Sequence, residues 1–378
     1  MKKIVSLFLA LLMVGSLAAC NSGDTPATTA ATTAAKTEAE TEKTEAAPET
    51  TEAAAATEAD ETTEADSSDV APAAEGKAWK IAVMPKLIGI PYFNASEVGA
   101  LKAGEDLGLE VQYIGPTNAD ATEQVKMIED LINQGIDALC VAPNDSAALS
   151  PVLQKCKDAG ILVLDWDTPA NPEDVVYSVN QVDQTEFAQL YFDKAVEIVG
   201  KEDFKYAIVT GGLNAANLNG WIDAGLAYAE EKYPNMELVT DRIPTDESQQ
   251  QAYQKTIELL AAYPDVECIL GYSTPTPLGA AKAVQEKGLQ DTVAVVGSST
   301  PKDSVEYLED GSLDAGLLWD PAQLGYLTVF VAREALEGRD LTDGQDVPGV
   351  GKITVDGKVI IMGAPSIWTK ENAGDYDF

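Results

Sequence analysis

Polar and aromatic residues that could bind a small ligand follow the predicted strands of this sequence, where each strand ends. Lys86 and Phe93 follow the first apolar run, Asn144 follows the third, and Asp167 follows the fourth. The corresponding residues of the second half of the chain are Asn217, Tyr272, Thr274, Ser299 and Asp320. Carboxylates and carboxamides form paired hydrogen bonds with neighbouring hydroxyl groups, and aromatic rings cover the C–H faces of a sugar. These residue types therefore predict a polyol-binding site.

Most of these residues also have a structural interpretation. Asp and Asn after a strand form turns and cap helices, and Asp320 followed by Pro321 is typical of a helix N-cap. Lys86 is harder to explain in this way, because a lysine after an apolar strand is poorly suited to a core.

An enzymatic alternative is a glycosidase, in which Asp167 and Asp320 would form the carboxylate pair. The sequence contains no histidine, which removes the commonest general base, and it has no Gly-x-Ser-x-Gly nucleophile motif and no phosphate-binding loop. We therefore expect a protein that is not an enzyme and that uses no cofactor and no metal ion.

Short apolar runs alternate with amphipathic stretches of helical length from residue 80 onward. The predicted strands are 80–84, 109–114, 138–142, 162–166, 206–209, 236–240, 268–271 and 293–297, with a C-terminal strand pair around 352–362. The predicted helices are 95–107, 121–133, 146–159, 221–232, 250–262, 277–287 and 322–336. Repeated strand–helix units require right-handed crossovers and predict an α/β fold with parallel sheets.

The alternation falls into two blocks, which predict two doubly wound lobes joined by a hinge. We expect the N-terminal lobe to comprise 77–180 plus about 320–345, and the C-terminal lobe 181–319 plus about 346–378. A single large sheet is the alternative architecture. Because ligands of open α/β sheets bind beyond the carboxyl ends of the strands, two lobes would place the site in the cleft between them.

The first 20 residues have the three parts of a signal peptide: Lys2 and Lys3, an apolar run over 4–14, and Leu-Ala-Ala before Cys20. This ending resembles the lipobox of bacterial lipoproteins, whose cysteine carries the lipid anchor. The alternative is an ordinary secretory leader with a cysteine there by chance. We expect an extracytoplasmic protein held on the bacterial cell membrane through Cys20.

The composition of 21–76 predicts a disordered linker. This Thr/Ala/Glu-rich segment has 14 acidic residues against 2 lysines and no aromatic residue, so it cannot bury enough apolar surface to fold. We interpret it as a spacer, and filler of unselected length is the alternative. The whole chain has a formal net charge of -37, which excludes nucleic acid as a partner. Cys140, Cys156 and Cys268 leave an odd number, so no disulfide framework is expected.

The chain from about residue 80 to its end resembles the type I periplasmic binding proteins, the sugar-binding lipoproteins of ABC importers, and within them the autoinducer-2- and rhamnose-binding branch. The resemblance is carried by Met84–Gly89, Gly115–Thr117, Ala142–Asp145, Leu164–Asp167, Val296–Pro301, Leu318–Asp320 and Lys370–Phe378. It implies capture of a small sugar-like ligand in the cleft, delivery to a permease with its ATPase, and a monomeric protein.

The resemblance also implies roles for single residues. Lys86 and Asp167 match the lysine and aspartate of the autoinducer-2 site. Asn217-Leu218 stands where that site has Asp-Gln, and Tyr272 and Thr274 stand where it has Pro and Ala, whereas 319–321 is more similar to the rhamnose-binding relatives. Rhamnose, pentoses, hexoses and autoinducer-2-like furanoses therefore remain candidate ligands. A sensor whose closed form is read by a receptor kinase, and an adhesin that has lost its ligand, are the alternative functions.

Overall fold

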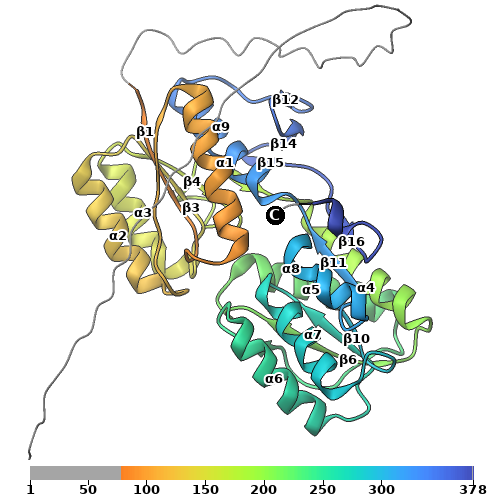
Figure 1. The fold of residues 1–378 in the computed structure, drawn as a ribbon. Helices are drawn as coiled ribbons and strands as arrows, with labels where there is room; N and C mark the ends of the chain where they lie inside the picture. The colour runs from red at the N-terminus through yellow and green to blue at the C-terminus, as the bar shows by residue number, and fades with distance from the viewer. Residues whose placement is uncertain (1–77, 377) are drawn as a thin grey trace, which may run out of the picture. The chain divides into compact units, whose positions relative to one another are not determined.

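The structure is a computed structural model that describes residues 78–376 and 378 (Figure 1). The predicted signal peptide with Cys20 and the predicted linker 21–76 lie outside the described residues. In the part of the chain that is described, no helix combines the length and apolarity that a membrane span needs.

The first sheet has seven strands in the order β2-β1-β3-β4-β5-β15-β14. Their bounds are β1 Lys80–Met84, β2 Glu110–Tyr113, β3 Ala138–Val141, β4 Leu162–Trp166, β5 Ser178–Asn180, β14 Thr354–Asp356 and β15 Val359–Ile361. All neighbours pair in parallel except β14 and β15, which are antiparallel. Every residue of β3 is buried, as expected for a central strand covered on both faces.

Helices cover both faces of this sheet: α1 Pro91–Leu107, α2 Ala121–Gln134, α3 Ser146–Asp158 and α9 Pro321–Leu336. Alternate residues of β1 face opposite sides. Ala82 and Met84 belong to one buried cluster with residues of α2 and α3, whereas Ile81 and Val83 belong to another with residues of α1 and α9. Figure 1 shows α1 and α9 side by side. We call this sheet with its four helices the first lobe.

The second sheet follows the order β16-β11-β10-β9-β6-β7, and β8 also pairs with β6. Its strands are β6 Lys205–Thr210, β7 Glu237–Leu238, β8 Ile243–Pro244, β9 Cys268–Gly271, β10 Ala294–Gly297, β11 Ala315–Leu318 and β16 Ser366–Trp368. Its helices are α4 Gln184–Val199, α5 Ala216–Lys232, α6 Gln249–Ala262, α7 Pro275–Lys287 and α8 Pro301–Asp310. We call this sheet with its helices the second lobe. A short pair, β12 Asp346–Val347 and β13 Gly351–Lys352, and a 3-10 turn, Ala373–Asp375, complete the described elements.

The predicted α/β class with two doubly wound lobes is confirmed, and two separate sheets exclude the single-sheet alternative. Two helices, α4 and α8, lie in segments where the sequence predicts no element. The assignment of 346–378 to the second lobe is wrong for part of that segment: β15 pairs with β5 of the first sheet, and β16 alone of this segment's strands joins the second sheet.

The chain passes between the lobes three times: between β5 and α4, between β11 and α9, and between β15 and β16. The segments that follow the carboxyl ends of the parallel strands of both sheets supply the residues of one pocket.

Candidate functional site

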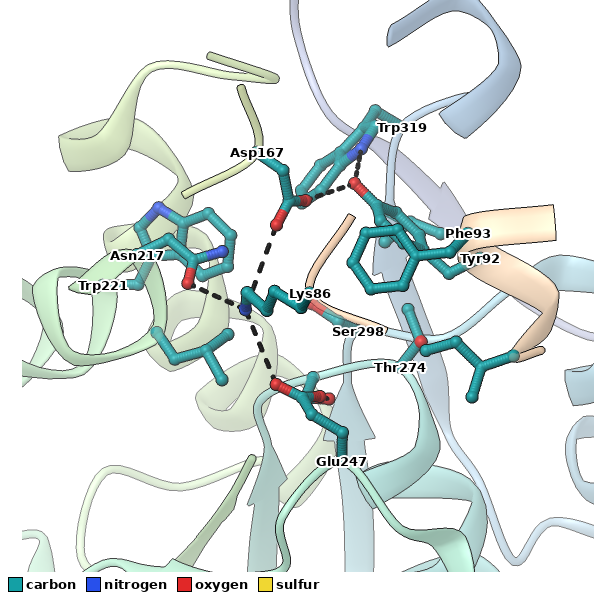
Figure 2. Close-up of a pocket in the computed structure, with 14 residues that line it drawn as sticks. Lys86, Tyr92, Phe93, Asp167, Asn217, Trp221, Glu247, Thr274, Ser298 and Trp319 are labelled. Carbon is teal, nitrogen blue, oxygen red and sulfur yellow. Dashed lines mark hydrogen bonds and ion pairs between the residues drawn. The ribbon is translucent and has the colours of Figure 1, made fainter. Parts of the chain in front are cut away.

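The candidate site is a pocket lined by residues of both lobes (Figure 2). Its lining residues are Lys86, Ile90, Tyr92, Phe93, Asp167, Asn217, Leu218, Trp221, Glu247, Ser273, Thr274, Ser298, Leu318 and Trp319. They come from segments that follow β1, β4, β6, β8, β9, β10 and β11, so the parallel topology of each sheet gathers them at one place.

Lys86 is the central cation of the pocket and is only 4% exposed. Its Nζ donates to Oδ1 of Asn217 at 3.2 Å and lies 3.5 Å from Oε1 of Glu247 and 3.9 Å from Oδ2 of Asp167. Asn217 and Glu247 belong to the second lobe, so this one ammonium group interacts with both lobes. A buried lysine needs such partners to keep its charge.

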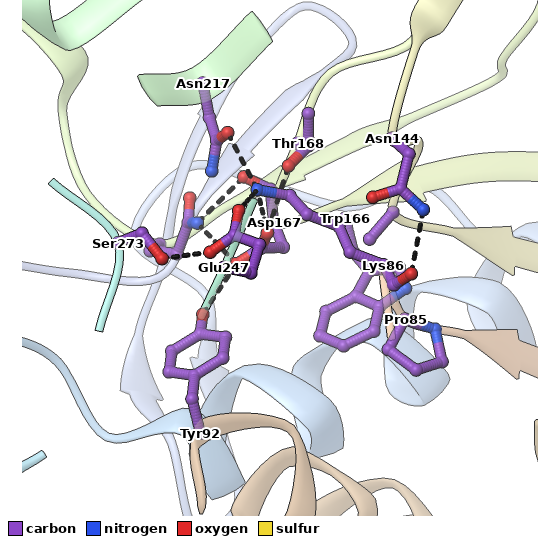
Figure 3. A network of polar contacts seen from close by, with 12 residues as sticks. Pro85, Lys86, Tyr92, Asn144, Trp166, Asp167, Thr168, Asn217, Glu247 and Ser273 are labelled. Atoms are coloured by element: carbon purple, nitrogen blue, oxygen red, sulfur yellow. Dashed lines mark hydrogen bonds and ion pairs between the residues drawn. The ribbon is translucent and has the colours of Figure 1, made fainter. Parts of the chain in front are cut away.

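Asp167 has a left-handed backbone, with φ of 62°, which Asp tolerates better than most residues. Its Oδ1 accepts hydrogen bonds from the Tyr92 hydroxyl at 2.7 Å and from Nε2 of Gln181 at 3.0 Å, and its Oδ2 accepts one from Oγ1 of Thr168 at 3.0 Å. These donors fix the carboxylate on the first-lobe side of the pocket (Figure 3).

Tyr92 connects this carboxylate to the aromatic wall. Burial and the charge of Asp167 raise the pKa of Tyr92 well above its ordinary value, so its hydroxyl stays protonated and donates to Asp167. Nε1 of Trp319 in turn donates to the Tyr92 oxygen at 3.0 Å. The chain of hydrogen bonds from Trp319 through Tyr92 to Asp167 therefore leaves none of these three groups unsatisfied.

Aromatic rings form the apolar side of the pocket. Tyr92 makes edge-to-face contacts with Phe93, at a centroid distance of 4.9 Å, and with Trp319, at 6.1 Å. Trp319 also contacts Trp221 at 5.8 Å. Such a wall suits the C–H faces of a sugar ring.

Glu247 lies in the loop between β8 and α6 and is 7% exposed. Its backbone and that of Asp246 are both left-handed, with φ of 58° and 49°. Its Oε2 accepts a hydrogen bond from the Ser273 hydroxyl, and its Oε1 points towards Lys86. Two consecutive non-glycine residues in this conformation are costly, and such strain is concentrated at functional sites.

The structure brings five of the nine predicted site residues to this pocket: Lys86, Phe93, Asp167, Asn217 and Thr274. The other four lie outside its lining. Tyr272 is fully buried and stacks on Tyr191 with centroids 4.0 Å apart, and Ser299 is buried against the hydroxyl of Ser304.

Asn144 and Asp320 have structural contacts instead. Nδ2 of Asn144 donates to the backbone oxygen of Lys86 at 2.8 Å, so Asn144 supports the lysine loop from outside the pocket. Asp320 accepts from the backbone N–H groups of Ala322 and Gln323 and is the N-cap of α9, as the capping interpretation predicts. It does not line this pocket, and its contact with a ligand stays a prediction.

The prediction omitted several lining residues. Tyr92, Trp221 and Trp319 have the sequence signature of core aromatics, and all three are indeed buried. Ser273 and Ser298 follow strands, as the predicted residues do. Glu247 has no signal of this kind, because its loop follows a two-residue strand and contains no apolar periodicity. Its neighbour Ser248, the N-cap of α6, was the nearest available indication that the segment is ordered.

Two doubly wound α/β lobes with a polar, aromatic-walled pocket between their strand ends define a periplasmic binding protein. Residues 81–340 match the family model described as "Periplasmic binding protein domain", and the chain belongs to this family, in its type I, sugar-binding class.

The chain is similar to curated proteins and to proteins of solved structure. The chain is 26% identical over 273 residues to the ribose import binding protein RbsB of Bacillus subtilis, which is 70% of this chain and 83% of that protein. It is 27% identical to LsrB of Clostridium saccharobutylicum in complex with AI-2, with a TM-score of 0.74 over 79% of this chain and all of the other. It is 29% identical to an ABC transporter solute-binding protein of Clostridium phytofermentans with bound L-rhamnose, with a TM-score of 0.75 over 79% of this chain and 98% of the other.

Proposed function

We propose that this protein is the substrate-binding lipoprotein of an ABC importer, which captures one small sugar or sugar-like polyol between its lobes and delivers it to a permease. The observation that carries the proposal is the pocket itself, because Lys86, Asp167 and Asn217 converge in it from two lobes beside a wall of buried aromatic rings. A ligand that touches both lobes stabilises the closed arrangement, and the permease reads that arrangement.

The spacing of the charged groups leaves a role for ligand hydroxyls. The two carboxylates lie 3.5 and 3.9 Å from the lysine Nζ, which is longer than an ordinary N–H···O hydrogen bond of about 2.7–3.2 Å. Each oxygen therefore attracts the lysine but can still accept a short hydrogen bond from a sugar hydroxyl. Because the acceptors are carboxylates, such bonds are charge-assisted and stronger than neutral ones.

The similar solved proteins supply the candidate ligands: AI-2 for one and L-rhamnose for the other. Leu218 and Thr274 line the pocket of this protein, and the resemblance to the autoinducer-2-binding branch matches them to a Gln and an Ala of that site. An apolar side chain at 218 offers no hydrogen bond to a hydroxyl at that position. We therefore favour a deoxyhexose or a pentose over AI-2.

A thermal-shift screen followed by calorimetry tests the proposal, with L-rhamnose, D-ribose, D-allose, D-glucose, D-galactose and AI-2 as ligands. A true ligand at 100 times its Kd adds about 2.7 kcal/mol to the free energy of unfolding, which is a readily measured rise in Tm. Absence of a shift with every one of these compounds would contradict sugar binding.

We further propose that the mature protein is monomeric and is held on the outer face of the cell membrane by a lipid on Cys20. The support is the Leu-Ala-Ala-Cys sequence after a short apolar run and two lysines. Replacing Cys20 with Ser should release the protein from the membrane fraction, whereas continued membrane association would contradict the anchor.

A further inference from the structure

The pocket contains one more carboxylate than cations. Its lining residues with a formal charge are Lys86, Asp167 and Glu247, and all three are less than 10% exposed. The polar side of the pocket therefore has a formal net charge of -1, carried by buried side chains.

Lys86 is already shared among acceptors of the protein. Its ammonium has three N–H groups, and it faces Asn217, Asp167 and Glu247 at 3.2, 3.9 and 3.5 Å. An acidic ligand would have to displace one of these partners and then place its own anion beside two buried carboxylates. Like charges at short distance in a buried site repel strongly, whereas a neutral polyol donates O–H groups to the same oxygens.

We propose that Glu247 is a ligand-binding residue that sets the charge selectivity of this pocket, so that neutral polyols bind and those carrying a carboxylate are excluded. The inference rests on the proposed sugar-binding function. Glu247 is suited to this role because its Oε2 is fixed by the Ser273 hydroxyl, while its Oε1 faces Lys86 beyond ordinary hydrogen-bond distance.

The surrounding loop holds this carboxylate in place. Thr245 anchors the loop to β6, because its N–H and its hydroxyl both donate to the backbone oxygen of Thr210. The carboxylate lies directly over Gly211: a Cβ at that position would be 2.5 Å from Oε1 and 2.7 Å from the carboxyl carbon of Glu247. Gly211 is therefore a positioning residue, since any larger residue there occupies the space of the carboxylate.

Gly211→Ala offers a way to move Glu247 without removing its charge. The atoms that the new methyl group meets are at the end of a flexible side chain, so the carboxylate rather than the backbone should shift. The φ of Gly211 is not in the left-handed region, so alanine fits the backbone. Glu247→Gln makes the complementary change, because it keeps the shape and removes the charge.

The experiment measures the Kd of the wild type, Glu247→Gln, Gly211→Ala and Glu258→Gln by calorimetry. Glu258 is the matched control, because it is an exposed glutamate of the adjoining helix α6, paired with Lys255. The ligands are the neutral sugars L-rhamnose, D-ribose, D-glucose and D-galactose, and the acids D-glucuronate and D-galacturonate. Circular dichroism and Tm report folding.

We expect the wild type to bind a neutral sugar at least 100-fold more tightly than either acid. Glu247→Gln and Gly211→Ala should each weaken binding of that sugar at least tenfold, and Glu247→Gln should lower the ratio of neutral to acidic affinity. Should Glu247→Gln not fold, Gly211→Ala decides alone.

Two results would overturn the inference and leave the proposed sugar binding intact: neutral-sugar affinity in both variants equal to that of Glu258→Gln, or tight binding of an acid by the wild type. If the wild type binds none of the six compounds, and neither D-allose nor AI-2 shifts its Tm in the sugar screen, the proposed function fails and the inference fails with it.

Discussion

At the scale of single residues, Asp167 is the point where the polar and aromatic parts of the pocket meet. It accepts hydrogen bonds from Tyr92, Gln181 and Thr168 and lies across from Lys86. Its left-handed backbone turns the chain away from β4, so that its carboxylate faces the pocket. The same environment that fixes this carboxylate also makes its charge valuable to a ligand, because few water molecules compete for it.

We predict that Asp167→Asn weakens sugar binding about tenfold to hundredfold. Asn tolerates the same left-handed backbone, but it loses the charge, and a hydrogen bond to a charged group is worth about 1.5–3 kcal/mol. Calorimetry with the best ligand of the sugar screen measures the change, and the exposed Asp203→Asn serves as the control. Equal affinity in the two variants would remove Asp167 from the ligand contacts.

How far the site could be predicted from sequence depended on the direction of each side chain. Lys86 and Asp167 were predictable, because parallel strands end at the same edge of a sheet. At the end of β9, however, the side chain of Tyr272 points into the core and stacks on Tyr191, and the next residues, Ser273 and Thr274, reach the pocket. After β10 the pocket residue is Ser298 rather than Ser299. A pattern of strand and loop places a residue near the site, but successive side chains point in different directions, and only the folded backbone decides between them.

At the scale of elements, the contact between α1 and α9 holds the aromatic wall in place. Tyr92 lies in the first turn of α1 and Trp319 lies just before α9, so the spacing of these helices sets the distance between the two rings. The helices approach closely because glycines face the partner backbone: a Cβ on Gly99 would be 1.8 Å from the backbone oxygen of Ala322, and one on Gly325 would be 2.1 Å from that of Ser96. Backbone atoms cannot move aside as a side chain can.

Gly325→Ala should therefore lower the free energy of unfolding by about 1–3 kcal/mol, the usual cost of overpacking, and should also weaken ligand binding by moving Trp319 away from Tyr92. Chemical denaturation and calorimetry measure the two effects. Gly363→Ala is the control, since a Cβ there meets nothing within 4 Å. If Gly325→Ala and Gly363→Ala are equally stable, the close approach of α1 and α9 is not required.

Strands and helices were predictable where a strong sequence pattern defines them. They were not predictable where tertiary packing determines which strands pair. Buried strands such as β3 and β9 are short apolar runs between turn residues, and the sequence predicts them within about a residue. Helix α4 has cap residues at both ends, Asp183 and Gly200, which are recognisable helix start and stop signals in the sequence. The sheet to which β15 belongs could not be predicted, because the sequence of a three-residue strand does not indicate which strand it pairs with.

At the scale of the whole molecule, negative charge is unevenly distributed along the chain. The formal net charge of the whole chain is -37. The leader contributes +2 through Lys2 and Lys3, and the linker contributes -12 through 14 acidic residues and 2 lysines, so residues 77–378 carry -27. Most of these carboxylates are exposed, but several are buried or half-buried, and at two of these burial shifts the pKa upward. Burial raises the pKa of Asp165, in the first lobe, to about 7, and that of Asp314, in the second, to about 6. These two groups make the stability of the fold depend on pH in the opposite sense to an ion-paired carboxylate.

The resulting prediction is that Asp165 destabilises the folded protein as the pH rises from about 4 to about 7. In the unfolded chain the pKa of Asp165 is close to its ordinary value of 3.8, whereas in the folded protein it is about 7, so between these values the unfolded chain releases a proton that the folded chain retains. The contribution of Asp165 to the slope of the unfolding free energy against pH is at most about 1.4 kcal/mol per pH unit.

Asp165→Asn should remove this pH dependence, because the amide is never charged, can still accept the N–H of Ala170 and can donate to Ser178. Urea unfolding at pH 4.5, 5.5 and 6.5 should show the variant gaining stability relative to the wild type at each step. Asp203→Asn, on the surface, should leave the profile unchanged, and parallel profiles for the wild type and Asp165→Asn would show that this buried carboxyl group does not titrate between these pH values.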